Sequence, residues 1–157
     1  MKKLFLIFIL ALFVISCDEE SQNQIAGLRT ITQRVEDLNK TKEEIKAIEE
    51  TAALMKEENS LLEYEYPIRL DESYVTTYRF KNNKCYEIKM DTYLNQVAHA
   101  KKVQHEVISY INKNGTFSKT TLKKGIYHWE SEDKHVFIDL NIQNIERGIV
   151  NLTIQLK

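Results

Sequence analysis

Glycine, cysteine and proline are all scarce in this sequence, and each shortage excludes something. The chain has four glycines among 157 residues, and none of them forms a phosphate-cradling loop, a dinucleotide fingerprint or a Gly-x-Ser-x-Gly motif. It has two cysteines, so no disulfide framework supports the fold. Its single proline is Pro67, so no proline interrupts residues 21–62. No repeat or low-complexity tract is present, and the length suits one modest globular domain.

The first seventeen residues differ sharply from the rest. Two lysines precede an apolar run from Leu4 to Ile15, which is followed by Ser16 and Cys17. A short basic start, about a dozen apolar residues and a small residue before the cut indicate a secretory signal. The run is too short to span a bilayer, which takes roughly 20 residues, and no later apolar run is long enough.

The residues Val14-Ile15-Ser16-Cys17 resemble the lipobox of bacterial lipoproteins. This resemblance implies cleavage after residue 16 and acylation of Cys17, by palmitate-type chains, as the first residue of the mature protein. Several acyl chains hold a protein on a bilayer far more firmly than one, since each buried methylene contributes about 0.8 kcal/mol. The alternative is an ordinary signal peptide, or an uncleaved anchor, with an incidental cysteine. The resemblance covers residues 1–17 only.

The acidic run Asp18-Glu19-Glu20 comes directly after that cysteine. It resembles a surface-export tag of lipoproteins in some Gram-negative bacteria, whereas an aspartate at this place can mark inner-membrane retention in others. We therefore expect a lipid-anchored protein of the cell envelope, at the outer membrane rather than the inner one.

Charge divides the mature chain into two unequal parts. Residues 18–66 hold 13 acidic and 6 basic side chains, whereas residues 67–157 hold 10 acidic and 14 basic ones. The two parts could attract each other, or the second could prefer an anionic partner.

A tether over 17–24 and a helical stalk over 25–62 are predicted next. Apolar residues recur there at steps of three and four, which indicates an amphipathic, coiled-coil-like helix. The alternative is a helical hairpin that breaks near Asn39, because Thr41-Lys42-Glu43-Glu44 fits a capping box. We expect the narrow apolar stripe to pack on a protein partner, a second copy or the chain's own second half. Its members are Leu28, Ile31, Val35, Leu38, Ile45, Ile48 and Met55.

Residues 63–157 predict an α+β domain of order ββαβββ, in which an antiparallel sheet packs one face on a helix. A further strand near Tyr66–Leu70 is an alternative that the sequence leaves open. In the first hairpin, a turn over residues 82–84 places Phe80 opposite Tyr86, Tyr78 opposite Ile88 and Arg79 opposite Glu87.

The remaining elements follow from spacing and turn residues. Asp91 or Thr92 can cap a helix over residues 93–113, which Asn114-Gly115 ends. Residues 116–124 predict a loop. A second hairpin places Trp129 opposite Val136 and Tyr127 opposite Ile138, and a strand over 150–156 completes the inner face.

No catalytic or metal-binding constellation emerges. His105-Glu106 begins like the zinc-protease motif His-Glu-x-x-His, but Ser109 stands where the second imidazole is needed. The predicted hairpin puts Glu130, not His128, opposite His135, which favours a surface pair over a metal site. Cys85 has no feature of a nucleophile beyond a nearby cation. We therefore expect no metal, no cofactor and no enzymatic activity, and a hydrolase with an unrecognised site is the least favoured function.

The favoured function is a membrane-anchored protein-binding or assembly module, attached to the bilayer through acylated Cys17. The alternative is a binder of an anionic envelope polymer or ligand through the basic segment 113–124. That segment carries Lys119, Lys123 and Lys124 beside Phe117, and cations beside aromatic rings can bind anionic polymers. Nucleic acid is not favoured, because the nearby Tyr127 and Trp129 are assigned to the core.

Overall fold

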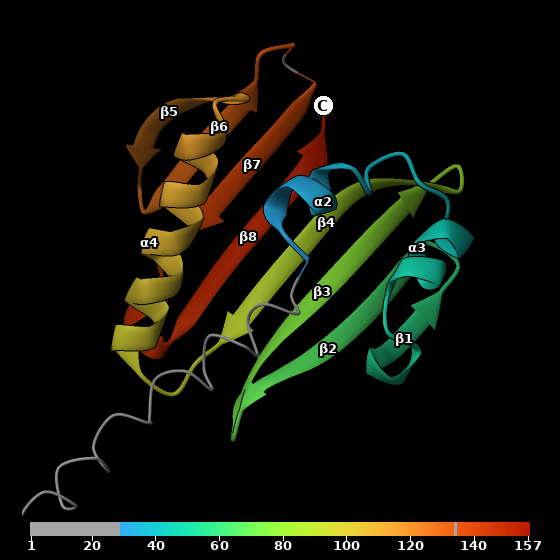
Figure 1. Ribbon diagram of the computed structural model, residues 1–157, viewed down its shortest axis with the longest axis horizontal. Helices are drawn as coiled ribbons and strands as arrows, with labels where there is room; N and C mark the ends of the chain where they lie inside the picture. The colour runs from blue at the N-terminus through green and yellow to red at the C-terminus, as the bar shows by residue number, and fades with distance from the viewer. Residues whose placement is uncertain (1–28, 134) are drawn as a thin grey trace, which may run out of the picture.

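One antiparallel sheet of eight strands forms the body of the protein (Figure 1). The computed structural model describes residues 29–133 and 135–157. The strands lie in the order β1-β2-β3-β4-β8-β7-β6-β5. Their bounds are β1 Leu54–Glu58, β2 Leu61–Arg69, β3 Glu72–Lys81, β4 Lys84–Tyr93, β5 Phe117–Lys123, β6 Ile126–Ser131, β7 Val136–Asn141 and β8 Ile149–Leu156.

The sheet consists of two four-stranded meanders joined by a long helix, α4 (Val97–Asn114). The first meander runs from β1 to β4 and the second from β5 to β8, and β4 pairs with β8 where they meet. Two short helices, α2 (Ile31–Val35) and α3 (Lys42–Ile48), precede β1. Figure 1 shows α2, α3 and α4 on the same side of the sheet. Within the described ranges, no helix is long and apolar enough to cross a bilayer.

Alternation of side chains gives the sheet one apolar and one polar face, as expected for an antiparallel sheet covered on one side. The inner face, under the helices, buries large side chains from every central strand, including Tyr78, Ile88, Ile138 and Ile154. The outer face carries charged pairs, such as Arg79 with Glu87 at 3.0 Å.

The predicted helical stalk over 25–62 is wrong. Instead, α2 ends at Val35 and Asn39 takes a left-handed conformation with φ of 67°. The backbone then bonds to the sheet, because Asn39 N–H donates to the Cys85 carbonyl and Cys85 N–H donates to the Lys40 carbonyl, both at 2.8 Å. The alternative start at Lys42 is confirmed: Thr41 caps α3, and the capping box with Glu44 is complete.

The stripe proposed for partner binding is therefore not one surface. Leu38 and Ile45 are buried in the protein's own core, whereas Ile48 and Met55 are exposed on different elements. Leu28 lies outside the described residues.

Residues 54–62 pair as strands although their composition favours a helix. β1 pairs with the first part of β2, from Leu54 opposite Tyr64 to Glu58 opposite Leu61. From Leu62 onward, burial alternates with a period of two, and Leu62 and Tyr64 both face the core. Burial and cross-strand bonds outweigh helix propensity here, as tertiary context commonly does.

The predicted order ββαβββ must therefore be corrected to ββββαββββ. The additional strand considered near Tyr66–Leu70 is the end of β2, and β1 has no counterpart in the predicted order. The segment 116–124, predicted as a loop, is mostly the edge strand β5. The helix begins at Val97 rather than at 93, because β4 continues to Tyr93, and its N-cap Gln96 makes no side-chain capping bond.

The first hairpin largely keeps its predicted register. Tyr78 lies opposite Ile88 and Arg79 opposite Glu87, but Phe80 lies opposite Cys85 instead of Tyr86. The cause is a two-residue turn at Asn82 and Asn83, with φ of 53° and 58°, which fits the type I′ geometry of tight hairpins. A bulge next to Phe80 absorbs the extra residue.

The second hairpin is shifted by two residues from the prediction. Trp129 lies opposite Ile138 and Tyr127 opposite Leu140, since the connection between β6 and β7 runs from residue 132 to residue 135. A shift of two keeps every side chain on its face, so the apolar faces still coincide.

Gly148 provides a test of the junction between β4 and β8. It has φ of 75°, and a Cβ atom there would lie 1.8 Å from the Leu94 carbonyl oxygen. We expect Gly148→Ala to lower the free energy of unfolding by about 3 kcal/mol or more, because the backbone at Leu94 must move to make room for the new methyl group. Gly115→Ala is the matched control, with φ of 65° and nothing within 4 Å of its Cβ position. It should cost only about 1–2 kcal/mol for the left-handed backbone. Urea unfolding of both variants measures the difference, and equal losses would contradict the expectation.

Candidate functional site

The inner face is not completely filled, and a cleft remains between α4 and the middle of the sheet. We call it the α4 cleft; its volume is about 280 Å³. Its floor comes from β2, β3, β4, β7 and β8, one wall from α4, and the other from the start of α2. The lining residues are Arg29, Thr30, Ile31, Ile68, Tyr74, Met90, Thr92, Val103, Glu106, Val107, Tyr110, Leu140, Val150 and Leu152.

The floor of the α4 cleft lies where the two meanders join. Met90 pairs with Leu152, and Thr92 with Val150, across the β4–β8 ladder. On α4, Val103, Val107 and Tyr110 follow one another at steps of four and three and therefore share a face. Most of the lining is apolar, which is typical of a site for an apolar ligand.

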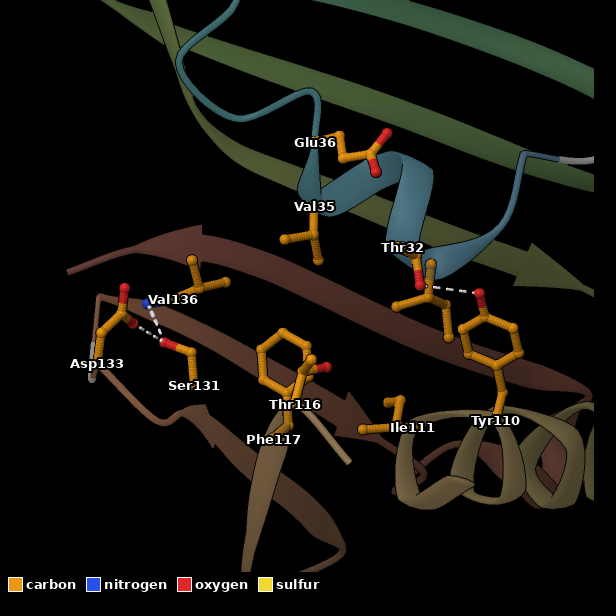
Figure 2. A pocket seen from close by; sticks show the side chains of 11 residues that line it. Thr32, Val35, Glu36, Tyr110, Ile111, Thr116, Phe117, Ser131, Asp133 and Val136 are labelled. Carbon is orange, nitrogen blue, oxygen red and sulfur yellow. Dashed lines mark hydrogen bonds between the residues drawn. The ribbon is translucent and has the colours of Figure 1, made fainter. Parts of the chain in front are cut away.

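A second pocket is lined by residues of α2, the end of α4, the start of β5, the end of β6 and the start of β7 (Figure 2). We call it the α2 cavity; its volume is also about 280 Å³. Ile31 and Tyr110 line both spaces. Figure 2 shows the Tyr110 hydroxyl directed at Thr32, with 2.9 Å between the two oxygens. This hydrogen bond links α2 to α4 at the boundary between the α4 cleft and the α2 cavity.

A buried ionic cluster stands beside the α4 cleft and fastens α2 and α3 to the sheet. Arg34 on α2 forms an ion pair with Glu49, which follows α3, and both side chains are almost fully buried. Arg34 also donates to the Tyr78 hydroxyl, which itself donates to Glu49 at 2.6 Å. Tyr66 donates to the other Glu49 oxygen. A buried charge pair with this many hydrogen bonds has its desolvation offset in a way that an isolated pair does not.

Asp37 and Arg29 extend the cluster to the mouth of the α4 cleft. Arg29 donates to Asp37 at 2.7 Å and to Glu49 at 3.3 Å, and Lys40 reaches Asp37 at 2.7 Å. The cluster therefore holds the three cations of Arg29, Arg34 and Lys40 against two carboxylates. Arg29, whose side chain is 20% exposed, also lines the cleft.

Burial and neighbouring groups determine the protonation states of Glu49 and Tyr78. Burial opposes ionisation of Glu49, but Arg34 and the hydroxyls of Tyr66 and Tyr78 outweigh it and hold the pKa of the carboxyl below its ordinary value. Burial raises the pKa of the Tyr78 hydroxyl far above its ordinary value. At neutral pH the carboxylate is charged and the phenol is protonated, which makes Tyr78 a donor to Glu49.

The sequence pattern does not predict this ionic cluster, because charged residues in a predicted amphipathic helix are expected on its solvated face. One signal was present: Arg34 lies three residues after Ile31 and four before Leu38, so it falls on the apolar side of that helical series. Glu49 and Asp37 carry no such signal, since their burial depends on where α2 and α3 dock.

The lysines predicted as a binding site lie away from the α4 cleft. Lys123 ends β5, and Lys124 follows in the turn to β6; both are exposed. Lys119 lies on β5 opposite Trp129 in the ladder. The three belong to the hairpin of β5 and β6 at the edge of the sheet. Cys17 lies outside the described residues.

Two of the histidines, His99 and His128, each lie against a carboxylate. His128 lies opposite Asp139, with Nδ1 and Oδ1 at 2.5 Å, whereas the predicted partner for His135, Glu130, lies opposite Phe137. His99 Nδ1 is 2.9 Å from Glu72, between α4 and β3. In the described part of the chain, no three His, Cys, Asp or Glu residues gather closely enough to hold a metal ion.

Cys85 is fully buried in the core. Burial raises the pKa of its thiol to about 12, so the reactive thiolate is scarce at neutral pH. It packs as a core residue beside Asn39 and Lys40.

Comparisons with known proteins assign no family: no family model, no curated protein and no solved structure matches the chain. The function must therefore be argued from the cleft and its surroundings.

The ionic cluster gives a prediction for stability and its pH dependence. Glu49→Gln should lower the free energy of unfolding by about 3–5 kcal/mol, because Arg34 is left buried without its counter-charge. The pKa of Glu49 is lowered in the folded state, so its stabilisation is present above the ordinary carboxyl pKa and is lost as pH falls through the lowered one. The variant should therefore lose stability less steeply on acidification than the unmodified protein.

Glu57→Gln is the control for this experiment. Salt bridges to Lys42 and Lys46 lower the pKa of Glu57 as well, mainly through hydrogen bonding, but its side chain is exposed. Its replacement should change stability little. Urea titrations between pH 3 and pH 7 measure the free energy of unfolding of both variants. Similar decreases for Glu49→Gln and Glu57→Gln would show that burial does not determine how much an ion pair stabilises the protein.

Proposed function

We propose that this protein is a lipid-anchored, non-enzymatic binding module of the bacterial cell envelope, and that the α4 cleft is its binding site. The single observation that carries the binding role is this apolar space at the centre of the inner face. A well-packed domain leaves few voids larger than a water molecule. A cleft of about 280 Å³ is close to the lower end of ligand pockets, roughly 300 Å³.

The rest of the described chemistry supports binding rather than catalysis. The buried ionisable groups of the Arg34 cluster are paired with one another, which gives them a structural role. The groups that line the α4 cleft are mainly aliphatic and aromatic, with Arg29 and Glu106 at its rim. Such a lining selects for shape and apolarity.

The lipobox-like residues Val14–Cys17 support the anchor. If Cys17 carries acyl chains, the domain that contains the α4 cleft stays close to the membrane surface. The outer membrane is favoured by the acidic run after Cys17.

Metabolic labelling tests the anchor. Cells that express the chain and receive an alkyne-tagged palmitate analogue should yield tagged protein in the membrane fraction. Cys17→Ser should abolish the tag and shift the protein out of that fraction, because the residual attachment lacks the acyl chains. An unlabelled wild-type chain, or unchanged partitioning of the Cys17→Ser variant, would contradict the anchor.

An apolar fluorescent dye tests the cleft. The chain from residue 18 onward should increase the fluorescence of 1-N-phenylnaphthylamine. Val107→Phe should reduce this uptake at least about tenfold, because the larger side chain fills the space where the dye binds. Ala98→Phe, on the exposed side of the same helix, is the matched control and should leave uptake unchanged. Equal uptake by both variants would contradict a binding role for the α4 cleft.

A further inference from the structure

We propose that the ligand of the α4 cleft is a free fatty acid of medium length, held with its carboxylate at Arg29 and its chain along α4. This assignment rests on the proposed function, since it names the class of ligand for the same site. Size, shape, charge and position in the chain each support it.

The volume fits one short chain rather than a whole phospholipid. An engineered protein cavity of about 150 Å³ holds one benzene, which has six carbons. By the same proportion, a space of about 280 Å³ holds an apolar group of about eleven carbons. A two-chain lipid is far larger, so a single-chain molecule is the better match.

One wall of the cleft runs along the helix. Val103, Val107 and Tyr110 lie along one side of α4 and line the cleft together. The seven residue steps between the first and last correspond to roughly 10 Å along a helix axis. Beyond Tyr110 the path meets the hydrogen bond to Thr32, which separates it from the α2 cavity. A chain that fills only the α4 cleft leaves this bond intact.

The charges at the rim give the ligand a direction. Arg29 belongs to a cluster with three cations and two carboxylates, so one positive charge is left over. Asp37 and Glu49 keep Lys40 and Arg34 as partners if Arg29 turns to a ligand. Glu106, on the wall formed by α4, repels a carboxylate. An anionic head is therefore favoured at Arg29 and disfavoured beside Glu106.

The position of Arg29 in the chain indicates that the fatty acid would come from the membrane. Twelve residue steps separate it from Cys17, and an extended chain covers at most about 40 Å over that length. With Cys17 acylated, the mouth of the cleft lies within that distance of the bilayer, where free fatty acids partition.

Photolabelling of the full acylated protein in phosphatidylcholine vesicles tests the assignment. The probe is a fatty acid with a diazirine in its chain and a terminal alkyne, and the adducts are mapped by mass spectrometry. We expect adducts on residues 103–110 and on Met90. Dodecanoate should displace the probe at about fivefold lower concentration than dodecanol, because only dodecanoate pairs with Arg29.

Three variants make the test specific. Arg29→Gln should remove the preference for dodecanoate over dodecanol, and Glu106→Gln should increase it about twofold. Val107→Phe should reduce adducts in the cleft at least about tenfold, whereas Ala98→Phe should not. If Val107→Phe fails to fold, Arg29→Gln and Glu106→Gln still test whether the carboxylate of the ligand lies at Arg29, because neither variant changes the apolar lining.

Several results would contradict the fatty-acid assignment. Adducts spread evenly over the surface, or equal displacement by dodecanoate and dodecanol, would overturn the fatty-acid assignment. So would labelling of the cleft by phosphatidylcholine that carries the same diazirine chain but not by the free acid. Dye uptake without fatty-acid labelling would reject this ligand while leaving the proposed binding function standing, and loss of palmitate labelling would reject the anchor alone.

Discussion

The antiparallel ladder between β4 and β8 is the interaction on which the rest of the structure depends. It joins strands that lie about sixty residues apart in the chain and turns two four-stranded meanders into one sheet. On the outer face, Asn151 donates to Asp91 at 2.6 Å across this ladder. At its end, Leu94 N–H donates to the Gly148 carbonyl at 2.9 Å. Without this pairing the α4 cleft would have no floor, because Met90, Thr92, Val150 and Leu152 come from its two sides.

The N-terminal segment is attached to that sheet by the buried ionic cluster as well as by Leu38 and Ile45, which lie in the core. Five residues of α2 are too few to form a stable helix alone, so their position depends on Arg34, Glu49 and Tyr78. The same cluster forms part of the wall of the cleft through Arg29 and lies close to Tyr74. Attachment of α2 and formation of the cleft are therefore coupled: a change that releases Arg34 also opens one wall of the site.

A binding role and a lipid anchor fit together in this arrangement. Arg29 lies at the rim of the apolar cleft, and Cys17, the proposed site of acylation, precedes it by twelve residues in the chain. An anchor that places the mouth of the cleft close to a bilayer shortens the path of an apolar molecule through water. Exposure of that molecule to water is the unfavourable step, since it leaves apolar surface hydrated.

The sequence by itself determined the local features. Alternation in the strands after residue 73 predicted the inner face. The predicted pairs Tyr78–Ile88 and Arg79–Glu87 are confirmed, although Phe80 lies opposite Cys85, and Asn114-Gly115 ends α4 as expected. The capping box at Thr41 predicted the start of α3, but only as the alternative to one continuous helix. Each of these depends on residues close in the chain, whose preferences act before any long-range contact forms.

Only the tertiary structure decided where residues 54–62 belong, that 117–123 form an edge strand, and that Asp37 and Glu49 are buried. Helix-forming residues such as Met55, Lys56 and Glu57 become a strand because β2 offers a free edge. A charged residue becomes buried because a partner of opposite charge arrives from another element. Both outcomes depend on pairings between distant parts of the chain, which the spacing of residues along the sequence does not encode.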